Sequence, residues 1–279
     1  MKIGIRLHDT APGTLPERLS FAKAQGFCCA HLALSKAVEG FRMEDAPERL
    51  NEALAAEVRD AFAQNGMELA VLGCYLNLAD PDPERRARTQ KIYQAHLRFA
   101  AMTGASVVGT ETFANPESHF AEAPAQSEEA FRLFMDSLRT VVRYAEEAGA
   151  VLAVEPVHHH IISTPARAAR MLEELPSPNL KIILDAVNLV GPKDAENPAP
   201  LFEEAIRLLG DQVRILHMKD YVIQPDGSTK SCACGLGCMR YERLLSFAKE
   251  RDLPMTLEDT RPDNAEQARL HLEAIARTL

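Results

Sequence analysis

The stretch Val151-Leu-Ala-Val-Glu155-Pro-Val157 decides the fold that we expect for this chain. Its unbroken apolar run is typical of a strand that is buried on both faces, as in a parallel sheet. The run ends on one carboxylate, Glu155. Three later stretches repeat this pattern and end on a polar group: Lys181-Ile-Ile-Leu-Asp185, Val213-Arg-Ile-Leu-His217 and Pro254-Met-Thr-Leu-Glu258.

Strand and helix patterns alternate along the chain. Apolar runs predict strands at residues 2–7, 27–34, 68–76, 106–112, 151–157, 180–184, 213–218 and 254–258. Helical periodicity, with capping and stop residues, predicts helices at residues 16–25, 47–65, 82–103, 127–148, 164–175, 198–209, 241–251 and 264–278. Strict alternation of this kind predicts a parallel sheet. A series of eight pairs predicts a closed (β/α)8 TIM barrel, with residues 1–279 as one domain.

A doubly wound open sheet is the alternative fold. Its dinucleotide-binding version carries Gly-x-Gly-x-x-Gly after the first strand. That motif does not follow residues 2–7 of this sequence. The closed barrel is therefore the favoured prediction.

The composition excludes several classes of partner. The chain has 31 basic and 40 acidic residues, which give a net charge of -9. Because no basic run occurs, we expect no nucleic-acid partner and no binding to anionic membranes. No stretch resembles a signal peptide or a membrane span. We expect a cytoplasmic protein, with a homo-oligomer as an open possibility.

The six cysteines are expected to be free thiols, as is usual without a secretory signal. Cys28, Cys29 and Cys74 lie in apolar runs and are expected to be core residues. Cys232, Cys234 and Cys238 form a denser cluster in the loop after the seventh strand. This cluster has no nearby fourth ligand and no standard zinc spacing, so we expect it to hold no structural metal.

The four strand-end residues predict a metal site. In a (β/α)8 barrel the active site lies at the carboxyl ends of the strands. Glu155, Asp185, His217 and Glu258 follow strands five to eight, which are expected to be neighbours in the wall. Three carboxylates and one imidazole suit one divalent ion, such as manganese, zinc, magnesium or cobalt. Each residue taken singly has an ordinary structural alternative, such as a helix cap or a hydrogen-bonded core histidine.

The sequence also resembles the xylose-isomerase-like TIM barrels, in particular the sugar phosphate isomerase/epimerase group. That group includes ketose 3-epimerases and inosose isomerases and dehydratases, and endonuclease IV is a remote relative. The stretches that carry the resemblance are Val154-Glu-Pro-Val157, Leu184-Asp-Ala-Val-Asn-Leu189, Leu216-His-Met-Lys-Asp220 and Leu257-Glu258, with Gly73-Cys-Tyr-Leu-Asn77 and Gly109-Thr-Glu111 in support.

The resemblance implies roles for the strand-end residues. It implies that Glu155, Asp185, His217 and Glu258 bind the metal. It also implies that Glu155 and Glu258 act as a general acid–base pair, which exchanges a proton next to a substrate carbonyl. A cation that stabilises the enediolate oxygens makes that proton acidic, and two carboxylates provide the base and the acid.

Two positions depart from the ketose epimerases. Asn188 stands where those enzymes usually have a histidine, and Ile223 lies where they carry an arginine. Lys219 is the nearest cation. These departures predict that the protein contacts its substrate through other side chains than the ketose epimerases do.

Five residues are candidate substrate contacts: His160, Lys219, Asn188, Glu111 and His8. The alternatives are a solvated loop for His160, and an arginine partner for Glu111. For Lys219 the alternative is a salt bridge to Asp220 or Glu258.

The sequence therefore predicts a metal-dependent isomerase or epimerase of a sugar, an inosose or a related polyol-ketone. Its substrate is expected to be a small-molecule carbohydrate. Two alternatives stay open. One is a dehydratase or lyase that uses the same enediolate, and the other is a barrel that binds a metal and a carbohydrate without turnover.

Overall fold

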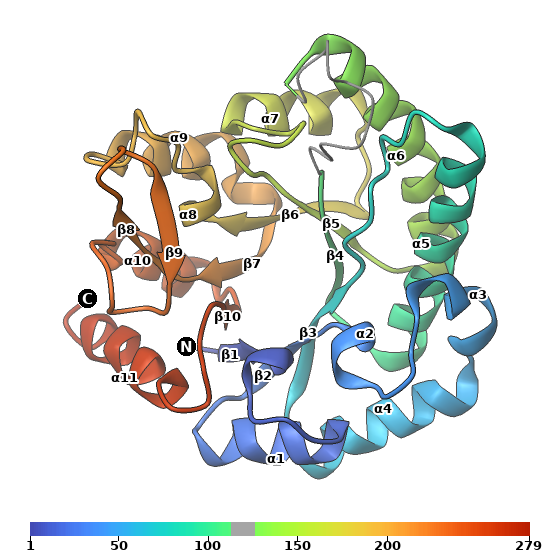
Figure 1. Cartoon of the computed structure of the whole chain (residues 1–279), viewed down its shortest axis with the longest axis horizontal. Helices are drawn as coiled ribbons and strands as arrows, with labels where there is room; N and C mark the ends of the chain where they lie inside the picture. Colours follow the sequence, from blue (N-terminus) through green and yellow to red (C-terminus); the bar gives the residue numbers. More distant parts are fainter. Residues whose placement is uncertain (113–125) are drawn as a thin grey trace.

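The computed structural model describes residues 1–112 and 126–279. Eight parallel strands close into a barrel in the order β1-β10-β7-β6-β5-β4-β3-β2 (Figure 1). The barrel strands are β1 (Ile3–Arg6), β2 (Cys29–Leu32), β3 (Glu68–Gly73), β4 (Val107–Glu111), β5 (Leu152–Glu155), β6 (Leu180–Asp185), β7 (Val213–Met218) and β10 (Met255–Leu257). The predicted (β/α)8 TIM barrel is confirmed.

Helices surround the barrel on its outer side (Figure 1). The longer helices are α1 (Leu15–Ala24), α4 (Glu52–Gln64), α5 (Pro83–Thr103), α6 (Glu128–Ala148), α7 (Pro165–Glu174), α9 (Ala199–Leu209), α10 (Glu242–Arg251) and α11 (Ala265–Ala276). Short turns of helix lie between them: α2 (Leu34–Ala37), α3 (Ala46–Arg49), α8 (Ala186–Leu189) and the 3-10 helices Leu7–Asp9, Met43–Asp45 and Gly210–Gln212. Among the described residues, no helix combines the length and the apolar content that a bilayer span requires.

The prediction of one helix over residues 47–65 is wrong in its first part. The structure has two helices there, α3 and α4. The break falls at Leu50, whose backbone leaves the helical region, and at Asn51. The side chain of Asn51 accepts a hydrogen bond from the backbone N–H of Leu54 at 3.1 Å. Because an asparagine in this position satisfies a free N–H at a helix start, it favours a new helix over a continued one.

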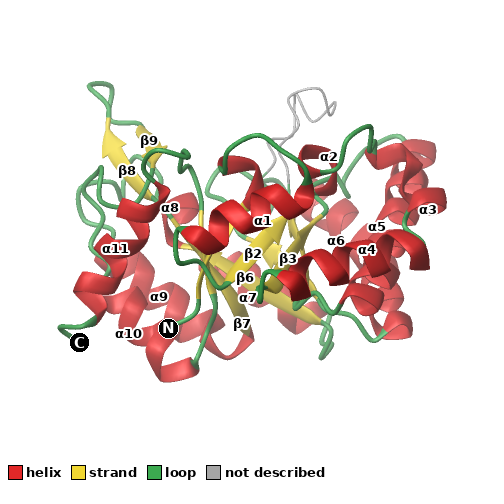
Figure 2. Cartoon of the chain, turned by 90° about the horizontal axis from the view of Figure 1, so that it is seen from below, coloured by secondary structure: helices red, strands yellow, loops and turns green. Residues whose placement is uncertain are grey.

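A hairpin stands apart from the barrel after β7. It consists of β8 (Asp220–Ile223) and β9 (Thr229–Cys232), which pair antiparallel. A turn at Asp226 and Gly227, a residue pair typical of turns, joins the two strands, and Gly227 has a positive φ of 82°. Figure 2 shows the hairpin projecting above the carboxyl ends of the barrel strands.

Two sets of buried side chains build the core. The larger set lies between the barrel and the helices and includes Leu152 and Val154. A separate cluster joins residues of neighbouring strands, among them Ala153, Ile183 and Ile215. Because successive side chains of a strand point to opposite faces, this second cluster fills the interior of the barrel.

Candidate active site

The alternation of side chains along the strands brings three polar residues together. Glu155, Asp185 and His217 each lie two positions after a residue of the inner cluster, Ala153, Ile183 and Ile215. A spacing of two keeps a side chain on the same face of its strand. The three polar side chains therefore continue the inner cluster toward the carboxyl end of the barrel.

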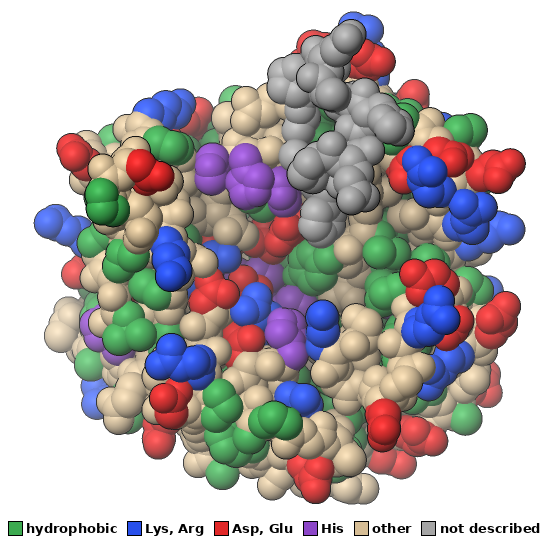
Figure 3. Space-filling model, viewed as in Figure 1, with side chains coloured by type: hydrophobic (Ala, Val, Ile, Leu, Met, Phe, Trp, Pro, Cys, Tyr) green, Lys and Arg blue, Asp and Glu red, His purple; other side chains and the backbone are tan. Residues whose placement is uncertain are grey.

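The structure places all four predicted metal ligands side by side. Glu155 ends β5, Asp185 ends β6, His217 lies in β7 and Glu258 directly follows β10, and these four strands are neighbours. The four residues are almost completely buried, with exposed fractions of 0% to 6%. Figure 3 shows acidic, basic and histidine side chains gathered at the centre of this face.

The imidazole of His217 lies between two carboxylates. Its Nδ1 is 3.0 Å from Oε2 of Glu155 and 3.3 Å from Oε1 of Glu258. Neither contact has the geometry of a hydrogen bond, and neither ring nitrogen has a hydrogen-bond partner among the described residues.

Two overlapping groups of the described residues fit a divalent cation, Glu155 with Asp185 and His217, and His31 with His217 and Glu258. Ligand atoms of Glu155, Asp185 and His217 all lie within 4.8 Å of one another. A cation held by these oxygens and this nitrogen would satisfy the buried imidazole and offset the crowded carboxylates. Carboxylate oxygen and imidazole nitrogen are the ligands that zinc, manganese and related ions take in proteins.

Lys219 and Asn188 hold the carboxylates of this group. The ammonium of Lys219 lies 2.9 Å from Oδ2 of Asp185 and 3.3 Å from Oε2 of Glu258. The side-chain amide of Asn188 donates to Oε1 of Glu155 at 2.6 Å, and its backbone N–H donates to Oδ1 of Asp185 at 3.0 Å. Asn188, on α8, thus connects the ends of β5 and β6.

The buried charges shift one another's protonation. Burial disfavours protonation of His217, but Glu258 and Glu155 outweigh it and raise the pKa of His217 to about 9. Burial would raise the pKa of Glu258, but His217 and Lys219 outweigh it and hold that pKa well below its usual range. Burial raises the pKa of Asp185 to about 6, although Lys219 opposes the shift. The group is a tightly coupled set of anions and cations.

Glu111 and His160 form a pair beside this group. Glu111 ends β4, next to Glu155 in the barrel wall. Nδ1 of His160 lies 3.7 Å from Oε2 of Glu111. Burial and the nearby Glu155 raise the pKa of Glu111 to about 8, and burial lowers the pKa of His160 to about 3. Within the run of three histidines, His160 is buried and His159 is exposed.

A cavity of about 340 Å³ opens onto the carboxyl end of the barrel. Its lining includes His8, His31 and Tyr75, from β1 to β3 and the segments after them, and Glu258 and Glu111 from the ends of the strands on either side of this arc, β10 and β4. Burial lowers the pKa of His8 to about 4, so this imidazole is neutral at physiological pH.

Three residues that lie in this region were not predicted as site residues: His31, Arg6 and Tyr75. His31, in β2, stacks on His217 with the ring centroids 5.4 Å apart. Arg6, at the end of β1, lies 3.6 Å from Oε2 of Glu258 and also pairs with Asp9 and Asp259.

Tyr75, the third, follows β3. Arg6 and His31 could have been predicted by the pattern used for the other strands, a polar residue near the carboxyl end of an apolar run. His31 is followed by further apolar residues, so this pattern is less clear there.

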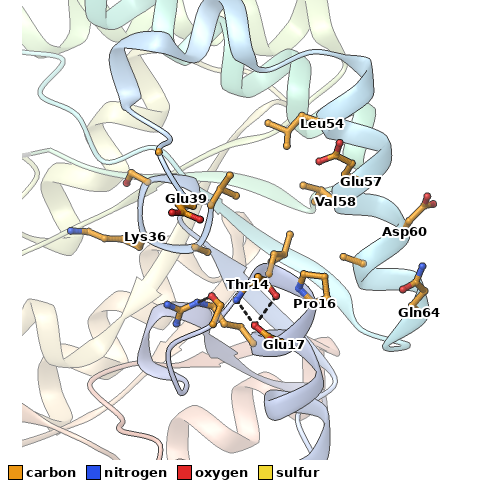
Figure 4. Close-up of a pocket in the computed structure, with 18 residues that line it drawn as sticks. Thr14, Pro16, Glu17, Lys36, Glu39, Leu54, Glu57, Val58, Asp60 and Gln64 are labelled. Carbon is orange, nitrogen blue, oxygen red and sulfur yellow. Dashed lines mark hydrogen bonds between the residues drawn. The ribbon is translucent and has the colours of Figure 1, made fainter.

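A larger groove of about 970 Å³ lies outside the barrel, between the start of α1, α2 and α4. Figure 4 shows its polar side chains, among them Glu57 and Asp60 along α4. Glu17 already accepts hydrogen bonds from the backbone N–H and the hydroxyl of Thr14, at 2.8 and 2.9 Å. None of the four predicted metal ligands lines this groove, so it is separate from the site at the strand ends.

Solved structures of low sequence identity share the fold. One is described as 3-keto-D-glucoside 4-epimerase YcjR from E. coli in its apo form; its TM-score is 0.74 at 20% identity, over 98% of this chain and 99% of that chain. A D-tagatose 3-epimerase-like protein has a TM-score of 0.77 at 17% identity, over 100% and 98% of the two chains. The IolI protein with a bound zinc atom has a TM-score of 0.72 at 15% identity, over 100% and 96%. No curated protein sequence matches this chain.

A family profile described as a xylose isomerase-like TIM barrel matches residues 19–277. The match contains seven of the eight barrel strands, from β2 to β10, and all four strand-end residues. It agrees with the closed barrel that the structure shows. The chain therefore belongs to the xylose isomerase-like TIM barrel family.

Proposed function

We propose that this protein is a divalent-metal-dependent isomerase or epimerase of a sugar, an inosose or a related polyol-ketone. The observation that carries the proposal is the pair of carboxylates, Glu155 and Glu258, that lie 3.0 and 3.3 Å from the same Nδ1 atom of His217. The epimerases among the structural neighbours support the same class of reaction. The zinc atom bound in the IolI structure supports a metal-binding barrel.

Glu155, Asp185, His217 and Glu258 are the proposed ligands. When bound, a divalent cation supplies electrostatic stabilisation of negative charge on substrate oxygens. Lys219 and Asn188 keep the carboxylates oriented through the contacts described above. His160, Lys219, Asn188, Glu111 and His8 are the proposed substrate contacts.

Glu155 and Glu258 are the proposed general base and general acid. They extend from β5 and from the end of β10, so they lie on different parts of the barrel wall. One carboxylate removes the proton on the carbon next to the carbonyl, and an enediolate forms. The other returns a proton to the opposite face, which gives the epimer. Loss of a neighbouring hydroxyl from the same enediolate would instead give a dehydrated product.

The test is solvent exchange. The protein is incubated in deuterated water with D-tagatose, D-fructose and an inosose, and deuterium next to the carbonyl is measured by NMR. We expect exchange with the true substrate. Glu155→Gln and Glu258→Gln keep the shape but remove the base, so turnover should fall by ~10²–10⁴-fold.

The controls separate chemistry from metal loss. Metal content is measured in each variant, because both residues are also proposed ligands. Glu57→Gln, an exposed change on α4, should leave turnover unchanged. Conversion without exchange would favour a direct hydride shift over proton transfer. If none of these polyol-ketones is converted, the proposed reaction is wrong and a non-catalytic barrel becomes the better account.

A further inference from the structure

Among the described residues, the buried hydroxyl of Tyr75 has no hydrogen-bond partner. The Oη atom is shielded from solvent and makes no hydrogen bond to any of the described residues. Tyr75 lines the cavity that also contains Glu111 and Glu258. A buried polar group without a hydrogen bond costs about 1–3 kcal/mol. The position of Tyr75 therefore needs a reason other than the stability of the free protein.

The other buried tyrosines of the described chain are satisfied. The hydroxyl of Tyr93 donates to the carbonyl of Leu76 at 2.9 Å. The hydroxyl of Tyr221 donates to the carbonyl of Ala195 at 2.8 Å, and that of Tyr241 contacts the carbonyl of Lys219 at 3.3 Å. An unpartnered phenol is thus a particular property of the cavity wall.

Two glycines keep the ring of Tyr75 in this place. A Cβ on Gly73 would lie 2.9 Å from Cε2 of the ring, and a Cβ on Gly109 would lie 3.2 Å from Oη. The ring of His31 flanks it at 5.6 Å between centroids. Because β3 and β4 leave room where the ring lies, and His31 limits its movement, the ring is held in the cavity wall with its hydroxyl beside Gly109.

The charges around Tyr75 define what its hydroxyl can bind. Burial, followed by Glu155 and Glu258, raises the pKa of Tyr75 well above its usual value, so the phenol keeps its proton and can donate it. The same carboxylates repel an anionic group at this point. A neutral oxygen, such as a sugar hydroxyl or carbonyl, is the acceptor that fits both conditions.

We propose that the hydroxyl of Tyr75 donates a hydrogen bond to an uncharged oxygen of the bound substrate, and that Tyr75 thereby selects oxygen-rich, neutral ligands at the β3 side of the cavity. This inference rests on the proposed function for the kind of ligand. The contact with the substrate would give the Tyr75 hydroxyl the hydrogen-bond partner that the described residues do not provide. Tyr75 thus differs from Tyr221, whose hydroxyl donates a hydrogen bond to the carbonyl of Ala195 within the fold.

Two matched variants test this inference. In Tyr221→Phe the carbonyl of Ala195 loses its donor, so the unfolding midpoint should fall while affinity for a sugar stays the same. In Tyr75→Phe the unfolding midpoint should stay or rise, because no hydrogen bond of the free protein is lost. Affinity for D-tagatose or D-fructose, measured by calorimetry on the metal-loaded protein, should fall about tenfold, the value of one hydrogen bond.

The outcomes separate this inference from the proposed function. Weaker sugar binding in Tyr75→Phe supports the inference even if neither sugar is converted, a result that would count against the proposed reaction alone. Equal sugar affinity in wild type and Tyr75→Phe overturns the inference, whatever the turnover. A loss of stability in Tyr75→Phe as large as in Tyr221→Phe overturns it as well. If neither sugar binds the wild type, the neutral-sugar assignment of Tyr75 is wrong.

Discussion

A single imidazole on α5, His96, makes folding sensitive to acid. His96 is completely buried. Its Nδ1 pairs with the carbonyl of Ile92 at 2.9 Å, and its Nε2 has no partner in the described part of the chain. Burial lowers the pKa of His96 to about 4, despite the hydrogen bond to Ile92. The folded protein therefore keeps this histidine neutral where the unfolded chain would protonate it.

The sign of the pH effect follows. As the pH falls below about 6.5, His96 becomes protonated in the unfolded chain, whereas in the folded protein it stays neutral until about pH 4. Between these values the free energy of unfolding should fall by roughly 3 kcal/mol from this group alone. In His96→Gln we expect a smaller loss of stability between pH 7 and pH 4.5, measured by urea unfolding. His271→Gln, at an exposed position on α11, is the control. An unchanged pH slope in His96→Gln would contradict the assignment.

At the same scale, the sequence predicted the strand-end residues but not the cavity wall. Glu155, Asp185 and His217 were found because each ends an unbroken apolar run. His31 lies within an apolar run that also contains two cysteines, so it was not predicted as a site residue. Tyr75 lies past the end of β3, and the absence of a partner for its hydroxyl depends on distant residues. Such a feature has no local sequence pattern.

At the scale of elements, one carboxylate organises the loop that contains the cysteine cluster. Asp220 is buried and accepts hydrogen bonds from the backbone N–H groups of Tyr221, Gly235 and Met239, at 2.8, 3.0 and 2.8 Å. These bonds fasten the segment after β9 to the start of β8. Lys219 and Asp220 therefore have separate roles. The side chain of Lys219 contacts Asp185 in the site, whereas the side chain of Asp220 holds the loop through its hydrogen bonds.

Removal of this carboxylate should loosen the loop. A hydrogen bond to a charged group contributes about 1.5–3 kcal/mol, so Asp220→Ala should lower the free energy of unfolding by about 3 kcal/mol or more. The buried thiol of Cys234 should also react faster with an alkylating reagent, measured by peptide mass spectrometry. The matched control is Asp226→Ala at the exposed hairpin tip, where the carboxylate accepts from Ser228. If labelling of Cys234 is equally slow in both variants, Asp220 does not hold the loop.

The barrel strands and the longer helices were predicted from the sequence, because their apolar runs and caps are regular. The short helices α2 and α8 were missed. The hairpin β8–β9 was also missed, although Asp226-Gly227 is typical of a turn, because its strands are short and polar at Thr229 and Lys230. The early break before α4 was missed because the capping action of Asn51 competes with a continuous helical pattern.

At the scale of the whole molecule, a bound cation should stabilise the barrel. The proposed ligands come from four neighbouring strands, so a metal would connect one half of the wall. A ligand at 100 times its dissociation constant adds about 2.7 kcal/mol to the free energy of unfolding. We expect removal of metal by a chelator to lower the thermal midpoint by several degrees.

Two variants make this prediction specific. We expect about one divalent ion per chain in the wild type. His217→Ala should lose most of this metal and should no longer respond to chelator. Cys232→Ser should respond like the wild type, because the cysteine loop is not a proposed ligand. Full metal occupancy in His217→Ala would show that the assignment of the ligands is wrong.

Most residues that line the cavity come from the first half of the sequence, and the proposed metal ligands come from the second half. The residues Arg6, His31, Tyr75 and Glu111 come from β1 to β4 and the segments that follow them, whereas every proposed metal ligand comes after α6. Recombination between related genes within α6 would therefore exchange this part of the wall and retain the whole ligand set, together with His160, Asn188 and Lys219. Two salt bridges of Arg6, to Glu258 and to Asp259, join the end of β1 to the segment after β10 across that junction. A chimera that preserves these contacts keeps its proposed metal ligands from one parent and takes part of its proposed substrate contacts from the other.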